Sequence, residues 1–213
     1  MKLLIAEYFK HINDFNFTAH CTREDFEKFN IDDSIIPFQK GLIPIEHGMR
    51  VCDIGTGGGF PGMPLAVLNP EIKFLLIDSV QKKLTLIDTI VKELEMKNVQ
   101  TLHSRLEEVG QSQLRETFDV VVSKAVAKWS TLLELALPLV SIGGYFYAYQ
   151  GKAIFEELEK NKSVIEKLGG AFEETFDYNI GDEKRYIVKV KKIRPTQRAF
   201  PRKAPLPKDN PLT

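Results

Sequence analysis

A short apolar segment that runs directly into a glycine-rich turn constrains this chain more than any other feature. The segment Val51–Ile54 is followed by Gly55-Thr56-Gly57-Gly58-Gly59-Phe60-Pro61-Gly62. Glycine has no Cβ and tolerates positive φ, so such a backbone passes close to a ligand where a side chain would collide. Gly57, Gly59 and Gly62 also fit the dinucleotide pattern G-x-G-x-x-G, although that match alone is weak evidence. The pattern predicts a strand and turn that hold a nucleoside cofactor.

The charge at the end of this segment distinguishes between cofactors. Asp53 precedes the first glycine by two residues. A carboxylate beside the turn would repel a pyrophosphate but would favour a cationic ligand. S-adenosylmethionine is such a ligand, and we expect it to be the cofactor.

The order of apolar segments predicts the fold. Residues 1–48 have helical spacing of apolar side chains and end in a region rich in proline and glycine. Short strands then alternate with amphipathic helices, which indicates a parallel, doubly wound sheet. The expected strands are Arg50–Ile54, Phe74–Asp78, Val99–His103, Phe118–Ser123 and Tyr145–Tyr149. The expected helices are Pro64–Leu68, Gln81–Glu95, Thr131–Val140 and Ala153–Leu168.

Two further strands complete the expected sheet. Phe172–Tyr178 and Tyr186–Ile193 are joined by Gly181-Asp182-Glu183, which is too short for a crossover helix, so they must pair antiparallel. We therefore expect an α/β, Rossmann-like class I methyltransferase fold: a seven-stranded, mostly parallel sheet with an antiparallel last strand and an N-terminal helical extension. The expected division is a helical extension at 1–48, a methyltransferase domain at 49–193 and a proline-rich, extended tail at 194–213.

Composition limits the partners and the compartment. The chain has 213 residues, and Lys+Arg and Asp+Glu are equal at 29 each, so net charge alone does not indicate nucleic acid. The tail is nevertheless basic, and we expect Arg198, Arg202 and Lys203 to bind RNA phosphates; the alternative is a solvated, disordered tail. Cys21 and Cys52 provide neither a disulfide framework nor a multi-cysteine metal site. We expect a cytoplasmic protein that needs no metal and binds neither membrane nor DNA.

The candidate cofactor residues, which include Lys124, follow the first four strands, because ligands lie over the carboxyl ends of strands in open α/β sheets. Gly55, Thr56, Gly57, Gly59 and Phe60 form the turn after the first strand. Asp78 ends the second strand, where an acidic side chain accepts ribose hydroxyls; a helix cap is its alternative role. After the third strand, the segment around Leu106 and Glu107 would contact the adenine, or would form a capping box starting at Ser104.

The segment after the fourth strand bears on the chemistry. Lys124 lies where methyl transfer would occur and is the candidate contact to substrate or cofactor; no catalytic base is assigned. The chain has no Asn- or Asp-Pro-Pro-aromatic segment there, which amine methylation uses, and Cys52 is expected in the core. Guanine N7 has a free in-plane lone pair, so its methylation requires alignment rather than a general base.

The sequence from Asp53 to Leu65 resembles the bacterial ribosomal small-subunit methyltransferase G family, with Phe60-Pro61-Gly62-x-Pro64 as its most specific part. Further similar segments are Asp78-Ser79-x-x-Lys82-Lys83, Ser104-Arg105-x-Glu107-Glu108, Ser123–Ala127 and Phe200-Pro201-Arg202-Lys203. The resemblance implies methyl transfer from S-adenosylmethionine to N7 of guanine 527 of 16S rRNA in the small ribosomal subunit. It also implies cofactor contacts at Gly55, Phe60, Leu106, Glu107 and Lys124, where Lys124 replaces the family's usual arginine.

Three other functions remain open from the sequence. A methyltransferase of small molecules or proteins would share the glycine turn and Asp78 but would not need the basic tail. A non-catalytic ribosome assembly factor would bind rRNA without methyl transfer. A nicotinamide dehydrogenase is disfavoured by Asp53 and by the antiparallel last strand.

Overall fold

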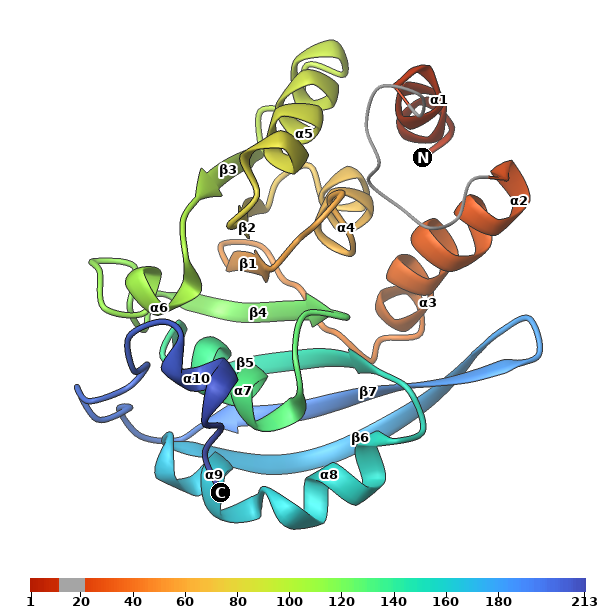
Figure 1. Ribbon diagram of the computed structural model, residues 1–213. Helices are drawn as coiled ribbons and strands as arrows, with labels where there is room; N and C mark the ends of the chain where they lie inside the picture. The colour runs from red at the N-terminus through yellow and green to blue at the C-terminus, as the bar shows by residue number, and fades with distance from the viewer. Residues whose placement is uncertain (12–21) are drawn as a thin grey trace.

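Seven strands form one sheet in the order β3-β2-β1-β4-β5-β7-β6 in a computed structural model that describes residues 1–11 and 22–213 (Figure 1). The strands are β1 Arg50–Ile54, β2 Lys73–Asp78, β3 Val99–His103, β4 Phe118–Lys124, β5 Val140–Gln150, β6 Gly170–Ile180 and β7 Glu183–Lys192. Strands β1 to β5 pair in parallel, whereas β7 pairs antiparallel with both β5 and β6. The predicted α/β fold with an antiparallel last strand is confirmed. Cys21 lies outside the described residues.

Helices cover both faces of the sheet (Figure 1). They are α1 Lys2–Lys10, α2 Arg23–Phe26, the π-helical segment η1 Glu27–Asp32, α3 Asp33–Gln39, α4 Gly62–Leu68, α5 Gln81–Glu93, α6 Leu106–Val109, α7 Trp129–Ala136, α8 Ile154–Lys160, α9 Lys162–Lys167 and α10 Leu206–Asp209. Successive strand residues point to opposite faces. Val120 and Val122 therefore join the core under α1, α4 and α5, whereas Val121 joins the core under α6 to α9. Burial on both faces explains the continuous apolar sequence of β4.

Two predicted helices differ from those observed by more than two residues at an end or in number. The helix expected at Thr131–Val140 ends at Ala136. Leu137 still has helical backbone angles, but Pro138 has no N–H to continue the helical hydrogen bonds. Val140 instead begins β5. The single helix expected at Ala153–Leu168 is divided at Asn161, whose side-chain amide donates a hydrogen bond of 2.7 Å to the carbonyl of Glu157.

The prediction of an extended tail was wrong. The tail, which we define as residues 194–213, folds back onto the body and includes the short helix α10, which contacts α7. Thr196, Phe200, Pro207 and Leu212 are all buried. In Figure 1 this dark blue segment lies beside α7. The division of the chain into three domains stays a prediction.

Candidate cofactor site

The glycine turn leaves β1 in a conformation that few other residues adopt. Gly55, Gly57 and Gly59 have φ values of +62°, +58° and +99°. A Cβ on Gly55 would come within 2.5 Å of a Val126 methyl group, so the turn and the segment after β4 are in close contact. The structure therefore requires glycine at position 55 both for its backbone angle and for the space above it.

Asp53 is a buried carboxylate behind this turn. Its Oδ2 accepts hydrogen bonds from Thr56 Oγ1 at 2.6 Å and from the N–H of Gly62 at 2.8 Å. Its Oδ1 has no hydrogen-bond partner among the described residues. Burial raises the pKa of Asp53 to about 7, although both hydrogen bonds act in the opposite direction. Asp53 is thus poised to change charge near neutral pH.

Asp78 connects the glycine turn to the end of β2. Its Oδ2 accepts a hydrogen bond of 2.8 Å from the N–H of Gly57, and its Oδ1 accepts one of 2.9 Å from the N–H of Val80. Val80 is the N-cap residue of α5, so the carboxylate holds both the turn and the start of a helix. Each carboxylate oxygen can accept a further hydrogen bond. The side chain can therefore still receive hydroxyl donors from a ribose.

A cavity of about 340 Å³ opens where β1 to β4 end. Its lining is Gly55, Asp78, Ser79, Val80, Lys83, Ser104, Arg105, Leu106, Glu107, Ala125, Val126, Ala127, Thr131, Leu135, Pro205 and Lys208. Four of the candidate residues, from three separate segments, lie together here: Gly55, Asp78, Leu106 and Glu107. The cavity lies at the carboxyl ends of the central strands, where ligands bind in open α/β sheets. A larger hollow of about 1050 Å³ lies at the opposite ends of the strands, near Arg50, Lys73 and Phe118, and lacks the glycine turn.

The segment after β3 begins a short helix without a side-chain cap. Helix α6 begins at Leu106, its N-cap residue is Arg105, and no side chain caps it. The alternative of a capping box starting at Ser104 was therefore wrong. Leu106 is buried and Glu107 is half-buried, and both line the cavity. Contact of these two residues with the adenine stays a prediction.

The Phe60 side chain packs elsewhere than at the cavity. Its ring packs against Tyr8 and Phe26 of the helical extension, with centroid distances of 5.1 and 5.6 Å. The Tyr8 hydroxyl also donates a hydrogen bond of 2.6 Å to the carbonyl of Gly58. Thr56, Gly57 and Gly59 likewise do not line the cavity: Thr56 donates to Asp53, and a Cβ on Gly59 would meet the Tyr8 hydroxyl at 2.5 Å. Thr56, Gly57, Gly59 and Phe60 therefore determine the shape of the turn without lining the cavity.

Lys124 is committed to the helical extension. Its Nζ lies 2.5 Å from Asp33 Oδ2 and donates a hydrogen bond of 2.7 Å to the carbonyl of Phe29. Burial lowers the pKa of Lys124, and the Asp33 carboxylate opposes that shift. It does not line the cavity. The observed ion pair therefore joins the end of β4 to η1 and α3.

The three predicted RNA-binding residues of the tail have different environments. Arg198 and Lys203 are exposed. Arg202 instead donates hydrogen bonds to both carboxylate oxygens of Glu134, which is fully buried in α7. Because the buried Glu134 occupies its guanidinium, Arg202 is not a free phosphate ligand in this structure.

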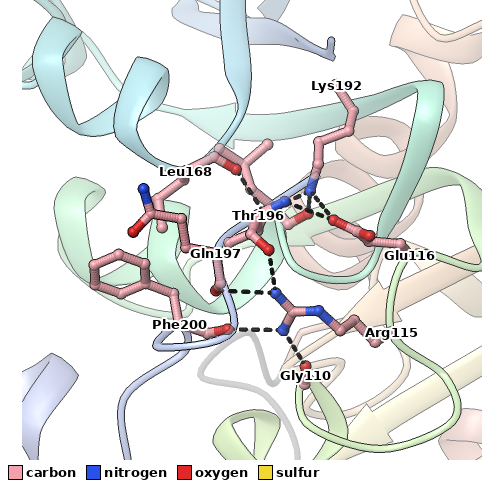
Figure 2. A network of polar contacts seen from close by, with 9 residues as sticks. Gly110, Arg115, Glu116, Leu168, Lys192, Thr196, Gln197 and Phe200 are labelled. Carbon is pink, nitrogen blue, oxygen red and sulfur yellow. Dashed lines mark hydrogen bonds and ion pairs between the residues drawn. The ribbon is translucent and has the colours of Figure 1, made fainter. Parts of the chain in front are cut away.

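A polar network that sequence reasoning missed holds the start of the tail (Figure 2). The Arg115 guanidinium donates hydrogen bonds of 2.7 Å to the carbonyls of Gly110, Phe200 and Thr196. Beside it, Lys192 donates to Thr196 Oγ1 at 2.6 Å and pairs with Glu116 at 3.1 Å. Burial lowers the pKa of Lys192 to about 8. Arg115 and Thr196 are 81 positions apart, and no local sequence pattern marks such a contact.

A small group at α1 and α5 has the composition of a metal site. One ligand atom each from Glu7, His11 and Glu93 lies within 4.8 Å of the others. Lys10 already forms an ion pair of 2.5 Å with Glu7, and His11 lies 3.3 Å from Glu93. The expectation that the protein needs no metal stays a prediction. Among the described residues, no helix is both long and apolar enough to cross a membrane.

Comparison with solved structures supports the fold. M. jannaschii TYW2 in complex with AdoMet superposes with a TM-score of 0.59 at 17% identity, covering 76% of this chain and 77% of that one. A SAM dependent methyltransferase from Aquifex aeolicus gives a TM-score of 0.57 at 19% identity, with 78% and 92% covered. At these identities the likeness concerns the fold.

Sequence comparison identifies the family. The sequence model described as rRNA small subunit methyltransferase G matches residues 2–185. Proteins named Ribosomal RNA small subunit methyltransferase G are similar over most of the chain. The one from Lactobacillus acidophilus is 38% identical over 96% of this chain and 88% of its own length, and one from Clostridium botulinum is 39% identical over 99% and 87%. This chain therefore belongs to the rRNA small subunit methyltransferase G family.

Proposed function

We propose that this protein transfers a methyl group from S-adenosylmethionine to N7 of guanine 527 in 16S rRNA of the small ribosomal subunit. As a member of its family, the chain is an S-adenosylmethionine-dependent methyltransferase of 16S rRNA. The base and the atom are the finer part of the proposal. We propose cytoplasm as its location, because its substrate is made there.

The observation that carries the proposal is the cavity at the carboxyl ends of β1 to β4. It brings the glycine turn, the carboxylate of Asp78 and the start of α6 to one place. We assign the ribose hydroxyls to Asp78, the adenine to the segment Arg105–Glu107, and the amino acid end to the turn at Gly55. Above its pKa of about 7, Asp53 adds negative charge behind that turn, which favours a cation.

The chemistry requires alignment more than acid–base catalysis. Bound here, S-adenosylmethionine supplies an electrophilic methyl group on a sulfonium. The lone pair of N7 is available without deprotonation, so the protein has only to hold the two reactants in line and exclude water. Cys52 is fully buried in β1, and burial raises the pKa of its thiol well above the ordinary value. Cys52 therefore cannot serve as a nucleophile toward a base.

The alternatives now need different tests. Truncation after Ile193 would remove Thr196, whose hydroxyl accepts a hydrogen bond from buried Lys192, so it would damage the fold under any function. The exposed cations Arg198 and Lys203 provide a better test of RNA recognition than truncation. A nicotinamide dehydrogenase does not agree with the family to which the chain belongs.

The test is transfer of labelled methyl to small ribosomal subunits, and to free 16S rRNA, from a strain that lacks the endogenous modification. Borohydride–aniline cleavage then maps 7-methylguanine. A single cleavage at guanine 527 supports the proposal. Methylation at another base would contradict the proposed position, and binding of cofactor and subunit without transfer would favour an assembly factor. Transfer only to small molecules or proteins would contradict the rRNA substrate.

A further inference from the structure

We propose that Arg202 is a positioning residue of the cofactor pocket: its ion pair with buried Glu134 holds the tail in place as one wall of that pocket. This inference rests on the proposed function and deepens it, because it assigns the tail a role in cofactor binding. The tail would then serve the cofactor through Arg202 and the RNA through its exposed cations.

The pair itself is fully formed. Arg202 donates from Nε to Glu134 Oε1 at 2.9 Å and from Nη2 to Oε2 at 2.7 Å. Its backbone N–H also donates to Oε1 at 2.8 Å, and Nη2 donates to the carbonyl of Asn210 at 2.9 Å. Two parallel bonds between guanidinium and carboxylate fix direction as well as distance. The pair therefore fixes the tail in one orientation on α7.

The fixed segment leads directly into the pocket. Pro205 and Lys208, which follow Arg202 in the tail, line the cavity. Between them, the carbonyl of Pro207 accepts a hydrogen bond of 2.7 Å from Thr131 Oγ1, and Thr131 also lines the cavity. This part of the tail is therefore held against α7, which carries both Thr131 and Glu134. Loss of the contact with Glu134 releases the tail segment that places Pro205 and Lys208 at the cavity.

The other side of Arg202 is held by packing and by the polar network of Arg115. Pro201 lies against Gly110, where an added Cβ would meet the proline ring at 2.6 Å. Gly110 has φ of −66°, so alanine is compatible with its backbone. The added methyl group of Gly110→Ala therefore displaces Pro201 and the tail, with no change in charge and no strain in the backbone. It is a second, chemically independent way to displace the wall.

The neighbouring residue provides the matched control. Lys203 is exposed, and no ion pair involving it is found in the part of the chain that the structure describes. Arg202→Gln and Lys203→Gln each remove one positive charge from adjacent positions. A general electrostatic effect on cofactor binding would be similar in the two variants. A positioning effect would occur in Arg202→Gln alone.

The experiment is calorimetric titration of the full chain with S-adenosylhomocysteine. We expect Arg202→Gln and Gly110→Ala to weaken binding about tenfold or more, and Lys203→Gln to change it less than twofold. Glu134→Gln/Arg202→Gln leaves no uncompensated buried charge and should recover folding, measured by thermal denaturation, but not affinity. With saturating rRNA, the KM for S-adenosylmethionine should rise in Arg202→Gln while kcat is kept.

Linkage supplies a second measurement on the unaltered protein. If the docked tail favours the cofactor, the cofactor must favour the docked tail to the same extent. Hydrogen exchange of the amides of Phe200 and Arg202, both hydrogen-bonded in this structure, should slow when S-adenosylhomocysteine binds.

The outcomes separate this inference from the proposed function. Wild-type protein that does not bind S-adenosylhomocysteine contradicts the proposed cofactor. Wild-type protein that binds it, together with Arg202→Gln and Gly110→Ala variants that fold and bind equally well, contradicts only the role of the tail. If Arg202→Gln does not fold, Gly110→Ala and the hydrogen-exchange measurement test the inference. Unchanged affinity in Gly110→Ala, together with unchanged exchange in the wild-type tail when S-adenosylhomocysteine binds, overturns it.

Discussion

Gly55 shows how closely one residue position can be constrained. Its φ is +62°, and a Cβ there would come within 2.5 Å of Val126. We expect Gly55→Val to abolish binding of S-adenosylhomocysteine and also to lower the free energy of unfolding by about 1–3 kcal/mol, through backbone strain and the clash. Gly143→Val is the control, since Gly143 has φ of +89° but no atom within 4 Å of the added Cβ. Normal calorimetric titration of Gly55→Val would refute the assigned position of the turn.

Asp78 carries two roles that one substitution would remove together. Asp78→Ala deletes the proposed ribose acceptor and also frees the N–H of Gly57. We expect affinity for S-adenosylhomocysteine to fall by about 1.5–3 kcal/mol, the range for losing a hydrogen bond to a charged group. Asp88→Ala is the control, because it also removes an aspartate that accepts a hydrogen bond. Asp88 lies on α5 and accepts that bond from Thr101 at the surface. Equal affinities in the two variants would count against the assignment.

Asp53 should make stability depend on pH in an unusual direction. The pKa of Asp53 is about 7 in the folded protein, whereas its ordinary value is 3.8. Between these two pH values the folded state therefore holds a proton on Asp53 that the unfolded state has lost. Its contribution to stability is therefore full below pH 4 and is lost as pH rises through 7. Between pH 5 and 8, wild type should lose on the order of 2 kcal/mol that Asp53→Asn keeps. Urea unfolding of both proteins at the two pH values tests this, and parallel pH profiles would contradict the raised pKa.

At the scale of elements, the extension α1 to α3 is joined to the sheet by buried polar contacts. Asp33, on α3, pairs with Lys124 and also accepts a hydrogen bond of 2.8 Å from Tyr178 on β6. Lys124→Met leaves the Asp33 carboxylate buried without its cation, and should lower the free energy of unfolding by about 3 kcal/mol. The double variant Lys124→Met/Asp33→Asn should be less destabilised than the sum of the single ones. Additive losses in urea unfolding would show that the pair is uncoupled.

Elements also explain why part of the site could be predicted. Gly55, Asp78 and Leu106 follow consecutive parallel strands, and such strands end at one edge of a sheet, so sequence order alone places them together. Phe60 and Lys124 could not be assigned in this way. Their partners Tyr8 and Asp33 belong to helices whose docking depends on long-range packing and not on a local period. The folded tail was missed for the same reason, since Arg115 and Glu134 hold it from distant positions.

At the scale of the whole molecule, equal numbers of positive and negative residues conceal an uneven distribution, with positive residues concentrated in the tail. Arg198 and Lys203 are both exposed on the tail. We expect Arg198→Glu/Lys203→Glu to weaken binding of 16S rRNA and to reduce its salt dependence by a slope of about 1–2, because phosphate contacts release counterions. Titration with S-adenosylhomocysteine should give wild-type affinity. An unchanged salt slope would exclude these residues from the RNA contact.

The order in which the chain is made has a consequence for when the cavity exists. Gly55, Asp78 and Leu106 leave the ribosome long before Pro205 and Lys208, which line the same cavity. A growing chain can thus complete its central strands while one side of the pocket is still unsynthesised. On this geometry, a chain that contains Thr196 but not yet Pro205 and Lys208 has an open and incomplete pocket. If the tail is a wall of the pocket, as inferred above, full cofactor affinity is acquired only after residues 205–208 have been made.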